Sequence, residues 1–137
     1  MRNIDTIFIH CSATRPSQDI GAEVIKSWHL DRGWSDIGYH YVIRRDGEIE
    51  TGRAEELPGA HAKGHNQNSL GICVVGGIDS SGSPDSNFTR AQWHSLEELV
   101  KRLTGLTGPA PGANVRGHRE VSHKACPCFD VSAWWHG

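Results

Sequence analysis

Ser69–Val75 has the sequence SLGICVV, in which apolar residues occupy both odd and even positions. Successive side chains of a strand point to opposite faces of a sheet, so this run is typical of a central strand covered on both faces. Thr6–His10 (TIFIH) is rich in β-branched and aromatic residues and predicts a second buried strand. His10 would then lie at the carboxyl end of that strand. The fold is therefore expected to be built on a sheet with helices packed against it.

Two stretches outside these strands predict helices. Apolar residues recur at helical spacing from Ile20 to Asp31, and Gly33 follows as a stop signal. Farther along, Thr89 and Gln92 fit a capping box, in which the two side chains satisfy free backbone N–H groups at a helix start. The expected core stripes are Ile20, Val24, Ile25 and Trp28 in the first helix, and Trp93, Leu96, Val100 and Leu103 in the second.

The remaining elements are a hairpin and two short segments. Tyr39–Arg44 and Glu48–Thr51 flank the pair Asp46-Gly47, which favours positive φ angles and predicts a type I′ turn between two antiparallel strands. Asn114–His118 predicts one more strand, and Val131–Trp135 a closing helical turn. The fold class expected from this order is α/β, with a mixed central sheet flanked by helices in one domain over residues 1–137.

Composition excludes several classes of function. The chain has 137 residues, 36% hydrophobic and 22% charged, with a formal net charge of −2. Proteins that bind nucleic acid through bulk charge carry a basic excess, so no nucleic-acid partner is expected. Near the start, only Ile7, Phe8 and Ile9 form an apolar run, far shorter than a signal peptide or membrane span. We therefore expect a monomer without membrane contact that accumulates in the cytosol with reduced thiols.

The segment Arg116–Asp130, RGHREVSHKACPCFD, concentrates groups that bind metals. A catalytic zinc site usually has three protein ligands, and mixed histidine and cysteine ligands suit this ion. His118 and Cys126, together with His10, would form such a set. Spacing alone leaves other assignments open: His123 and Cys128 are competing ligands, and the histidines could equally be satisfied core residues.

Longer stretches of the chain carry a resemblance to a known family. These stretches are IHCSATRPSQ at Ile9–Gln18, GWSDIGYHYVIRRDG at Gly33–Gly47, GAHAKGHNQNSLGICVVGGID at Gly59–Asp79, HKACPCFD at His123–Asp130, and the closing pair Trp134-Trp135. They cover nearly the whole chain in order. The chain resembles the type 2 N-acetylmuramoyl-L-alanine amidases, and within them the small lysozyme-amidases, or endolysins, of podophages that infect enterobacteria.

The resemblance assigns roles to individual residues. It implies one zinc ion held by His10, His118 and Cys126, with Tyr39 and Lys124 as the catalytic side chains. His61 matches a histidine that lines the substrate groove in the family. The fold implied is that of type 2 amidases and peptidoglycan-recognition proteins. The chain departs from the family pattern at one position. Cys128 stands where relatives usually have a small polar residue, and it offers a second thiol near the zinc.

The implied chemistry accounts for these residue types. An amide is a poor electrophile, so its hydrolysis needs an activated water, stabilisation of charge on the carbonyl oxygen and a proton for the leaving amine. Zinc makes water acidic enough to lose a proton near neutral pH. Lys124 is expected to stabilise the oxyanion, and Tyr39 to orient the water or pass a proton to the leaving nitrogen. The sequence does not exclude an exchange of these two roles.

The implied substrate is bacterial peptidoglycan, cut between N-acetylmuramic acid and the L-alanine of the stem peptide. As a phage lysis enzyme, the protein would be made in the host cytoplasm and reach the wall through a pore made by another protein. Two alternatives remain: a non-catalytic peptidoglycan-recognition module, and a regulator that inhibits the phage RNA polymerase in addition to lysis. His29 is expected at the surface, and Trp34, in a loop, to meet the substrate.

Overall fold

The computed structural model describes residues 2–137. Five strands form one sheet: β1 (Thr6–Cys11), β2 (Tyr41–Ile43), β3 (Ile49–Thr51), β4 (Ser69–Val74) and β5 (Asn114–Gly117). The helices are α1 (Ala22–Asp31), α2 (Arg90–Thr104) and α3 (Val131–His136), with a 3₁₀ turn, η1, at His118–Glu120. Each predicted strand and helix is present, with boundaries within about two residues of those expected, as is usual for element ends.

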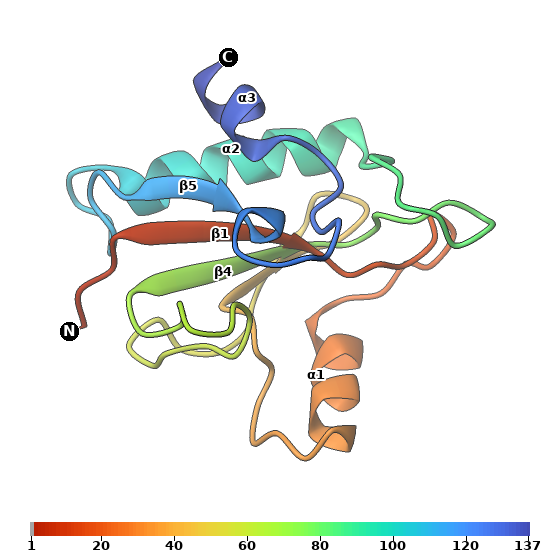
Figure 1. Ribbon diagram of the computed structural model, residues 1–137, viewed down its shortest axis with the longest axis horizontal. Coiled ribbons are helices and arrows are strands. Elements are labelled where there is room, and N and C mark those ends of the chain that lie inside the picture. The colour runs from red at the N-terminus through yellow and green to blue at the C-terminus, as the bar shows by residue number, and fades with distance from the viewer. Residues whose placement is uncertain (1) are drawn as a thin grey trace.

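The sheet is mixed, as predicted, and its strand order is β3-β2-β4-β1-β5. β1 pairs in parallel with both β4 and β5, and β2 pairs in parallel with β4. Among the strand pairs of this sheet within residues 2–137, only β2 and β3 are antiparallel. Since parallel strands end at the same edge, the carboxyl ends of β1, β4 and β5 meet there, and η1 follows β5 directly at this edge (Figure 1).

Helices cover the two faces of the sheet separately, with α2 and α3 on one side and α1 on the other (Figure 1). Alternation along the strands divides the core accordingly. Ile7, Ile9 and Cys11 of β1 belong to the larger hydrophobic cluster, together with the buried stripe of α2 at Leu96, Leu99, Val100 and Leu103. The intervening residues Phe8 and His10 therefore point toward the α1 side. Alternation thus places the predicted zinc ligand His10 on the face opposite α2.

The α1 helix presents a different face to the core than its apolar spacing predicts. Ile25 is buried, as expected, but Val24 and Trp28 are 38% and 37% exposed. The second buried residue of α1 is His29, which is 6% exposed and not at the surface. Its Nδ1 accepts a hydrogen bond from the backbone N–H of Gly38 at 2.9 Å. This bond satisfies one ring nitrogen of His29. It explains why His29, and not the neighbouring Trp28, occupies the buried face of α1.

The hairpin turn also differs from the prediction. Gly47 has φ +89°, but Asp46 is not among the non-glycine residues with positive φ, so the turn is not type I′. Instead, Gly47 N–H donates to the carbonyl of Arg44, and Arg44 N–H donates to the carbonyl of Glu48. This pattern closes a three-residue loop whose last residue is left-handed, the next most common hairpin form.

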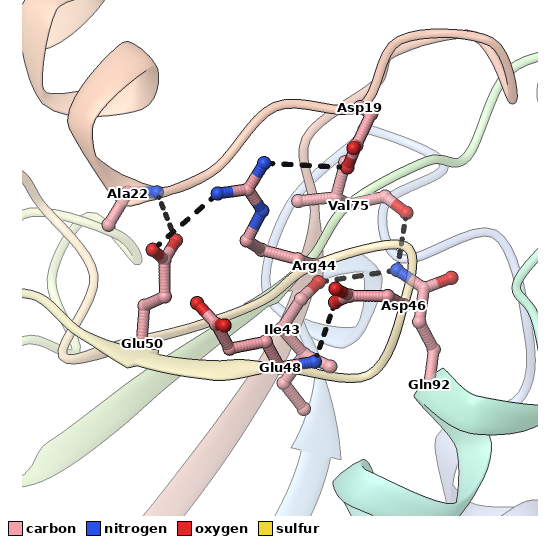
Figure 2. A network of polar contacts seen from close by, with 9 residues as sticks. All are labelled: Asp19, Ala22, Ile43, Arg44, Asp46, Glu48, Glu50, Val75 and Gln92. Atoms are coloured by element: carbon pink, nitrogen blue, oxygen red, sulfur yellow. Dashed lines mark hydrogen bonds and ion pairs between the residues drawn. The ribbon is translucent and has the colours of Figure 1, made fainter.

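Polar side chains connect this hairpin to the helices on both sides of the sheet (Figure 2). Glu50 accepts a hydrogen bond from Ala22 N–H at 2.8 Å and caps the start of α1, where Gly21 provides no side chain. On α2, Gln92 completes the predicted capping box with Thr89. Its Nε2 also donates to the carbonyls of Ile43 and Val75, at 3.2 and 2.8 Å. Glu50 thus fixes the start of α1 to β3, and Gln92 fixes α2 to the carboxyl ends of β2 and β4.

In the described part of the chain, every helix is too short or too polar to cross a bilayer.

Candidate metal centre and active site

His10, His118 and Cys126 lie together at the carboxyl edge of the sheet, although the outer two are 116 positions apart in sequence. His10 is on β1 and only 1% exposed, His118 opens η1 directly after β5, and Cys126 follows in the next loop. One ligand atom from each lies within 4.8 Å of the others. The sequence-predicted ligands are therefore brought together by the parallel arrangement of β1 and β5.

This group fits a zinc ion. Tetrahedral Zn–N and Zn–S bonds of about 2.0 to 2.3 Å separate ligand atoms by roughly 3.5 Å, so small side-chain rotations would complete the geometry. Burial lowers the pKa of His10 well below its usual value, and the neighbouring His61, His118 and Lys124 act in the same direction. Burial and Lys124 also lower the pKa of His118. Both imidazoles are thus neutral near pH 7, the state in which histidine binds a metal.

Local hydrogen bonds hold the other two candidate ligands, Cys126 and His118, in place. Cys126 Sγ accepts the backbone N–H of Cys11 at 3.1 Å, which ties it to the end of β1. Glu120 accepts the N–H of Gly117 at 2.7 Å and closes the turn that begins at His118. Among the described residues, His123 and Cys128, which spacing left as competitors, do not belong to the metal-ligand group.

A chain of hydrogen bonds leads from the interior to His10. Ser69 Oγ donates to the carbonyl of His65 at 2.7 Å, so toward the ring of His61 it can only accept, from Nε2 at 3.4 Å. Nδ1 of His61 then carries no hydrogen and accepts from Nε2 of His10 at 2.9 Å. A neutral His10 oriented this way keeps the lone pair on its Nδ1 free. His61 therefore contacts a candidate ligand as well as the groove.

His61 is itself fixed by close packing. It is 8% exposed, and burial, together with His40, lowers its pKa to about 3. Gly71 of β4 lies directly against the ring, so that a Cβ at this position would approach it to 2.6 Å. Asn66 Oδ1 accepts the backbone N–H groups of His61 and Ala62 at 3.0 and 2.9 Å. The lack of a side chain at Gly71 thus allows the imidazole to reach His10.

Tyr39 and Lys124, the predicted catalytic pair, line the same hollow as the candidate ligand group. The Tyr39 ring precedes β2, with its centroid 5.1 Å from that of His10. Burial raises the pKa of Tyr39 well above its usual value, and the thiols of Cys73, Cys126 and Cys11 add to the effect. Tyr39 is thus a neutral hydrogen-bond donor at physiological pH. Lys124 is exposed on the loop before Cys126 and lowers the pKa of both His10 and His118.

Two hollows in the surface share this site. The smaller, of about 240 Å³, is lined by the ligand group, Tyr39 and Lys124. The larger, of about 570 Å³, extends past Lys63, Asn66 and Ser122, and its size suits a small-molecule or polymer segment. Both are lined by Trp34, Ala60, His61, His118 and Lys124. The exposed Trp28, which its spacing assigned to the core, lines the smaller hollow instead.

Two residues at the site had no functional assignment from sequence. Ser69 was identified only as the start of a strand, and Arg32 lay at the end of a helix. Arg32 lines the smaller hollow, and its guanidinium lies 5.8 Å from the centre of the Trp34 ring. Neither belongs to a sequence pattern that marks a site, because each acts through a nearby residue of the chain that the fold turns toward it, His61 for Ser69 and Trp34 for Arg32.

Comparisons with known proteins agree with this geometry. A model of the family described as N-acetylmuramoyl-L-alanine amidase matches residues 1–129. The endolysin of Escherichia phage T7 is 53% identical over 131 residues, which cover 96% of this chain and 85% of that protein. The endolysin of Enterobacteria phage T3 is 51% identical over the same shares of both chains.

A solved structure extends the similarity to the fold. The N-acetylmuramoyl-L-alanine amidase LysC from Clostridium intestinale superposes with a TM-score of 0.81 over 98% of this chain and 87% of that chain, at 28% identity. The mixed sheet with flanking helices, predicted from the strand pattern and from the resemblance, is therefore confirmed.

Proposed function

Because the chain belongs to the N-acetylmuramoyl-L-alanine amidase family, we propose that residues 1–137 form a zinc-dependent catalytic domain that cuts peptidoglycan between N-acetylmuramic acid and L-alanine. The amidase activity follows from the family and from its endolysin relatives. The zinc requirement rests on one observation in particular, the convergence of His10, His118 and Cys126 beside Tyr39 and Lys124.

Two neutral imidazoles and one thiolate would hold the zinc and leave a net charge of +1. When bound, zinc supplies Lewis acidity, which polarises a carbonyl and makes water acidic enough to deprotonate near neutral pH. His61 would keep His10 in the tautomer that binds through Nδ1, since it accepts the hydrogen of Nε2. The ligand group lines the smaller hollow, and His118 also lines the larger one, so a scissile amide bound across the two would lie beside the metal.

The two catalytic side chains would stabilise the oxyanion and supply a proton to the leaving amine. Lys124 carries a positive charge at the border of both hollows and would stabilise the developing oxyanion of the amide carbonyl. Tyr39 stays protonated because burial raises its pKa, so its hydroxyl would donate a hydrogen bond and pass a proton toward the leaving nitrogen of L-alanine. The opposite assignment would make Lys124 the proton donor.

A cell-wall digest tests the proposal. Purified protein with one zinc per chain should release free amino termini from peptidoglycan without new reducing sugar ends, and EDTA should abolish the release. Activity that survives EDTA would refute zinc dependence, and new reducing ends would indicate a glycosidase. A zinc-loaded sample that hydrolyses no wall would restore the recognition-module alternative.

The biological setting proposed is host lysis by a phage enzyme, because the most similar relatives named above are phage endolysins. The protein would be made in the host cytoplasm, act as a monomer and reach the wall through a pore formed by another protein. Binding to the phage RNA polymerase stays a prediction. A pull-down with the cognate polymerase, using wild type and Cys126→Ala, would test it separately from hydrolysis.

A further inference from the structure

Two thiols outside the ligand group face each other next to it. Cys11, at the end of β1, and Cys128, in the loop before α3, have Sγ atoms 3.9 Å apart. Both lie beside Gly77, where an added Cβ would come within 2.6 Å of Cys11 Sγ and 3.7 Å of Cys128 Sγ. Cys128 also donates from Sγ to the Gly77 carbonyl at 3.2 Å. All four cysteines of the chain are free thiols.

We propose that Cys11 and Cys128 are a modification site, at which a disulfide forms when the folded protein meets a disulfide oxidant. A disulfide bond is about 2.05 Å long, so the two sulfurs need to close by roughly 2 Å. The Gly77 backbone leaves this space open. The crosslink would join β1 to the loop that carries Lys124 and Cys126.

The geometry selects this pair among the four thiols. Cys126 Sγ is engaged by the backbone N–H of Cys11 and lies with His10 and His118. Cys73 is fully buried in the cluster on the α1 side of the sheet. The side chains of Cys11 and Cys126 also interact, but the hydrogen bond that holds Cys126 Sγ comes from the backbone N–H of Cys11, so a disulfide through the side chain of Cys11 leaves that bond in place. The crosslink is therefore compatible with an intact metal-ligand set.

The reaction is a thiol–disulfide exchange in two steps. The half-exposed Cys128, as its thiolate, attacks a small-molecule or protein disulfide, which releases one thiol and leaves a mixed disulfide on Cys128. Cys11 then attacks the Cys128 sulfur and releases the second thiol. Two cysteines lose two electrons, the oxidant disulfide gains them, and the two protons go to the departing thiols.

The setting of this reaction rests on the proposed function. An enzyme that cuts peptidoglycan acts outside the cytosol, in a compartment where disulfides form and persist. The crosslink would form after arrival there. The loop holding two of the active-site residues would then be joined covalently to the central strand while the wall is being cut.

The experiment equilibrates full-length, zinc-loaded protein in glutathione buffers that range from reducing to oxidising, and then traps free thiols by alkylation. Mass analysis should show four thiols per chain in reducing buffer and two in oxidising buffer, with a peptide that links Cys11 to Cys128. The melting temperature should rise by about 5 to 15 °C, because the crosslink closes a loop of more than a hundred residues. Zinc per chain should not change.

Two variants serve as matched controls. Cys128→Ser should keep all three of its thiols in the oxidising buffer and show no rise in melting temperature. Cys73→Ser loses a thiol outside the pair and should still form the crosslink. A linked peptide that contains Cys126, a crosslink between two chains, loss of zinc on oxidation, or four thiols that persist in oxidising buffer would each overturn the proposal. These readouts need no wall hydrolysis, so an inert but crosslinked protein would refute only the amidase mechanism.

Discussion

The proposed active site has two halves that are built differently. The strand half consists of His10, Tyr39 and His61, which lie on or beside the central strands, and two of these are less than 10% exposed. The loop half consists of His118, Lys124 and Cys126, which are half-buried or exposed and lie in a segment whose only regular element is η1. The strand half is positioned by the same packing that forms the core. The loop half depends on a few hydrogen bonds and, in our proposal, on the metal.

Removing a ligand from each half should have the largest effect. His10→Ala and Cys126→Ala should each lose zinc and at least about 10³-fold in wall hydrolysis, because the activated water disappears. The two variants should differ in the stability of their zinc-free forms. His10→Ala removes a buried ring and should lower the melting temperature of zinc-free protein, whereas Cys126→Ala should leave it nearly unchanged. Metal analysis, hydrolysis and calorimetry measure the three effects, and equal loss of zinc-free stability would contradict the distinction.

The catalytic pair offers the next largest effect. Tyr39→Phe in the strand half and Lys124→Met in the loop half should each lower kcat by about 10²- to 10³-fold with zinc retained. Lys124→Met should in addition raise the pKa of His118, because the nearby cation lowers it. Titration of the zinc-free variant by NMR would detect that shift. Loss of zinc from either variant would instead show that the replaced residue helps to bind the metal.

Substitution of His61 tests whether a residue of the strand half that is not itself a ligand contributes to zinc binding through His10. His61→Phe removes the acceptor for Nε2 of His10 and should weaken zinc binding by about 10- to 100-fold, the usual range for residues that orient a ligand. Ser69→Ala should have a smaller effect in the same direction. Competition with a chelator measures both affinities. Unchanged affinity with a raised KM would restrict His61 to the groove, the role that the sequence predicts.

Metal removal should expose the difference between the halves directly. In zinc-free protein, amide hydrogen exchange in residues 118–126 should accelerate by about 10-fold or more, while exchange in β1 and β4 should stay slow, since few buried contacts hold the loop. Hydrogen exchange followed by mass spectrometry resolves the two segments. Equal acceleration in both would show that the halves are one cooperative unit.

The smallest effect concerns stability and pH. His40 is 1% exposed, accepts the N–H of Gly71 at Nδ1 and donates from Nε2 to the Leu57 carbonyl; burial lowers its pKa to about 4. The unfolded chain binds a proton near pH 6.5 and the folded one only near pH 4, so stability should fall as the pH drops between these values, by about 1.4 kcal/mol per unit. Above pH 6.5 the effect vanishes.

The control for this prediction is His40→Gln, which keeps a donor and an acceptor but does not titrate. Denaturant unfolding of zinc-free protein at several pH values should give a shallower decline for the variant than for wild type. Parallel curves would show that His40 is not responsible for the decline.

Sequence alone predicted the strand half better than the loop half, for physical reasons. Ser69–Val75 and Thr6–His10 carry local patterns that specify buried strands, and the parallel pairing then places His10 at the active edge. The candidate ligands His118 and Cys126 lie in a segment without periodicity, so only the family resemblance selected them over His123 and Cys128. The burial of His29 was missed because its partner, the N–H of Gly38, is supplied by the loop that follows α1.

Gly71 shows how the absence of one side chain can position a residue of the proposed active site. The hydrogen in place of a side chain there lets the His61 imidazole sit where it meets His10. A single methyl group, introduced from inside the sheet, would push against that ring, which also lines both hollows. Gly71→Ala therefore offers a way to tune wall cutting from a buried position in the central strand, where engineering of a lytic protein would not ordinarily start.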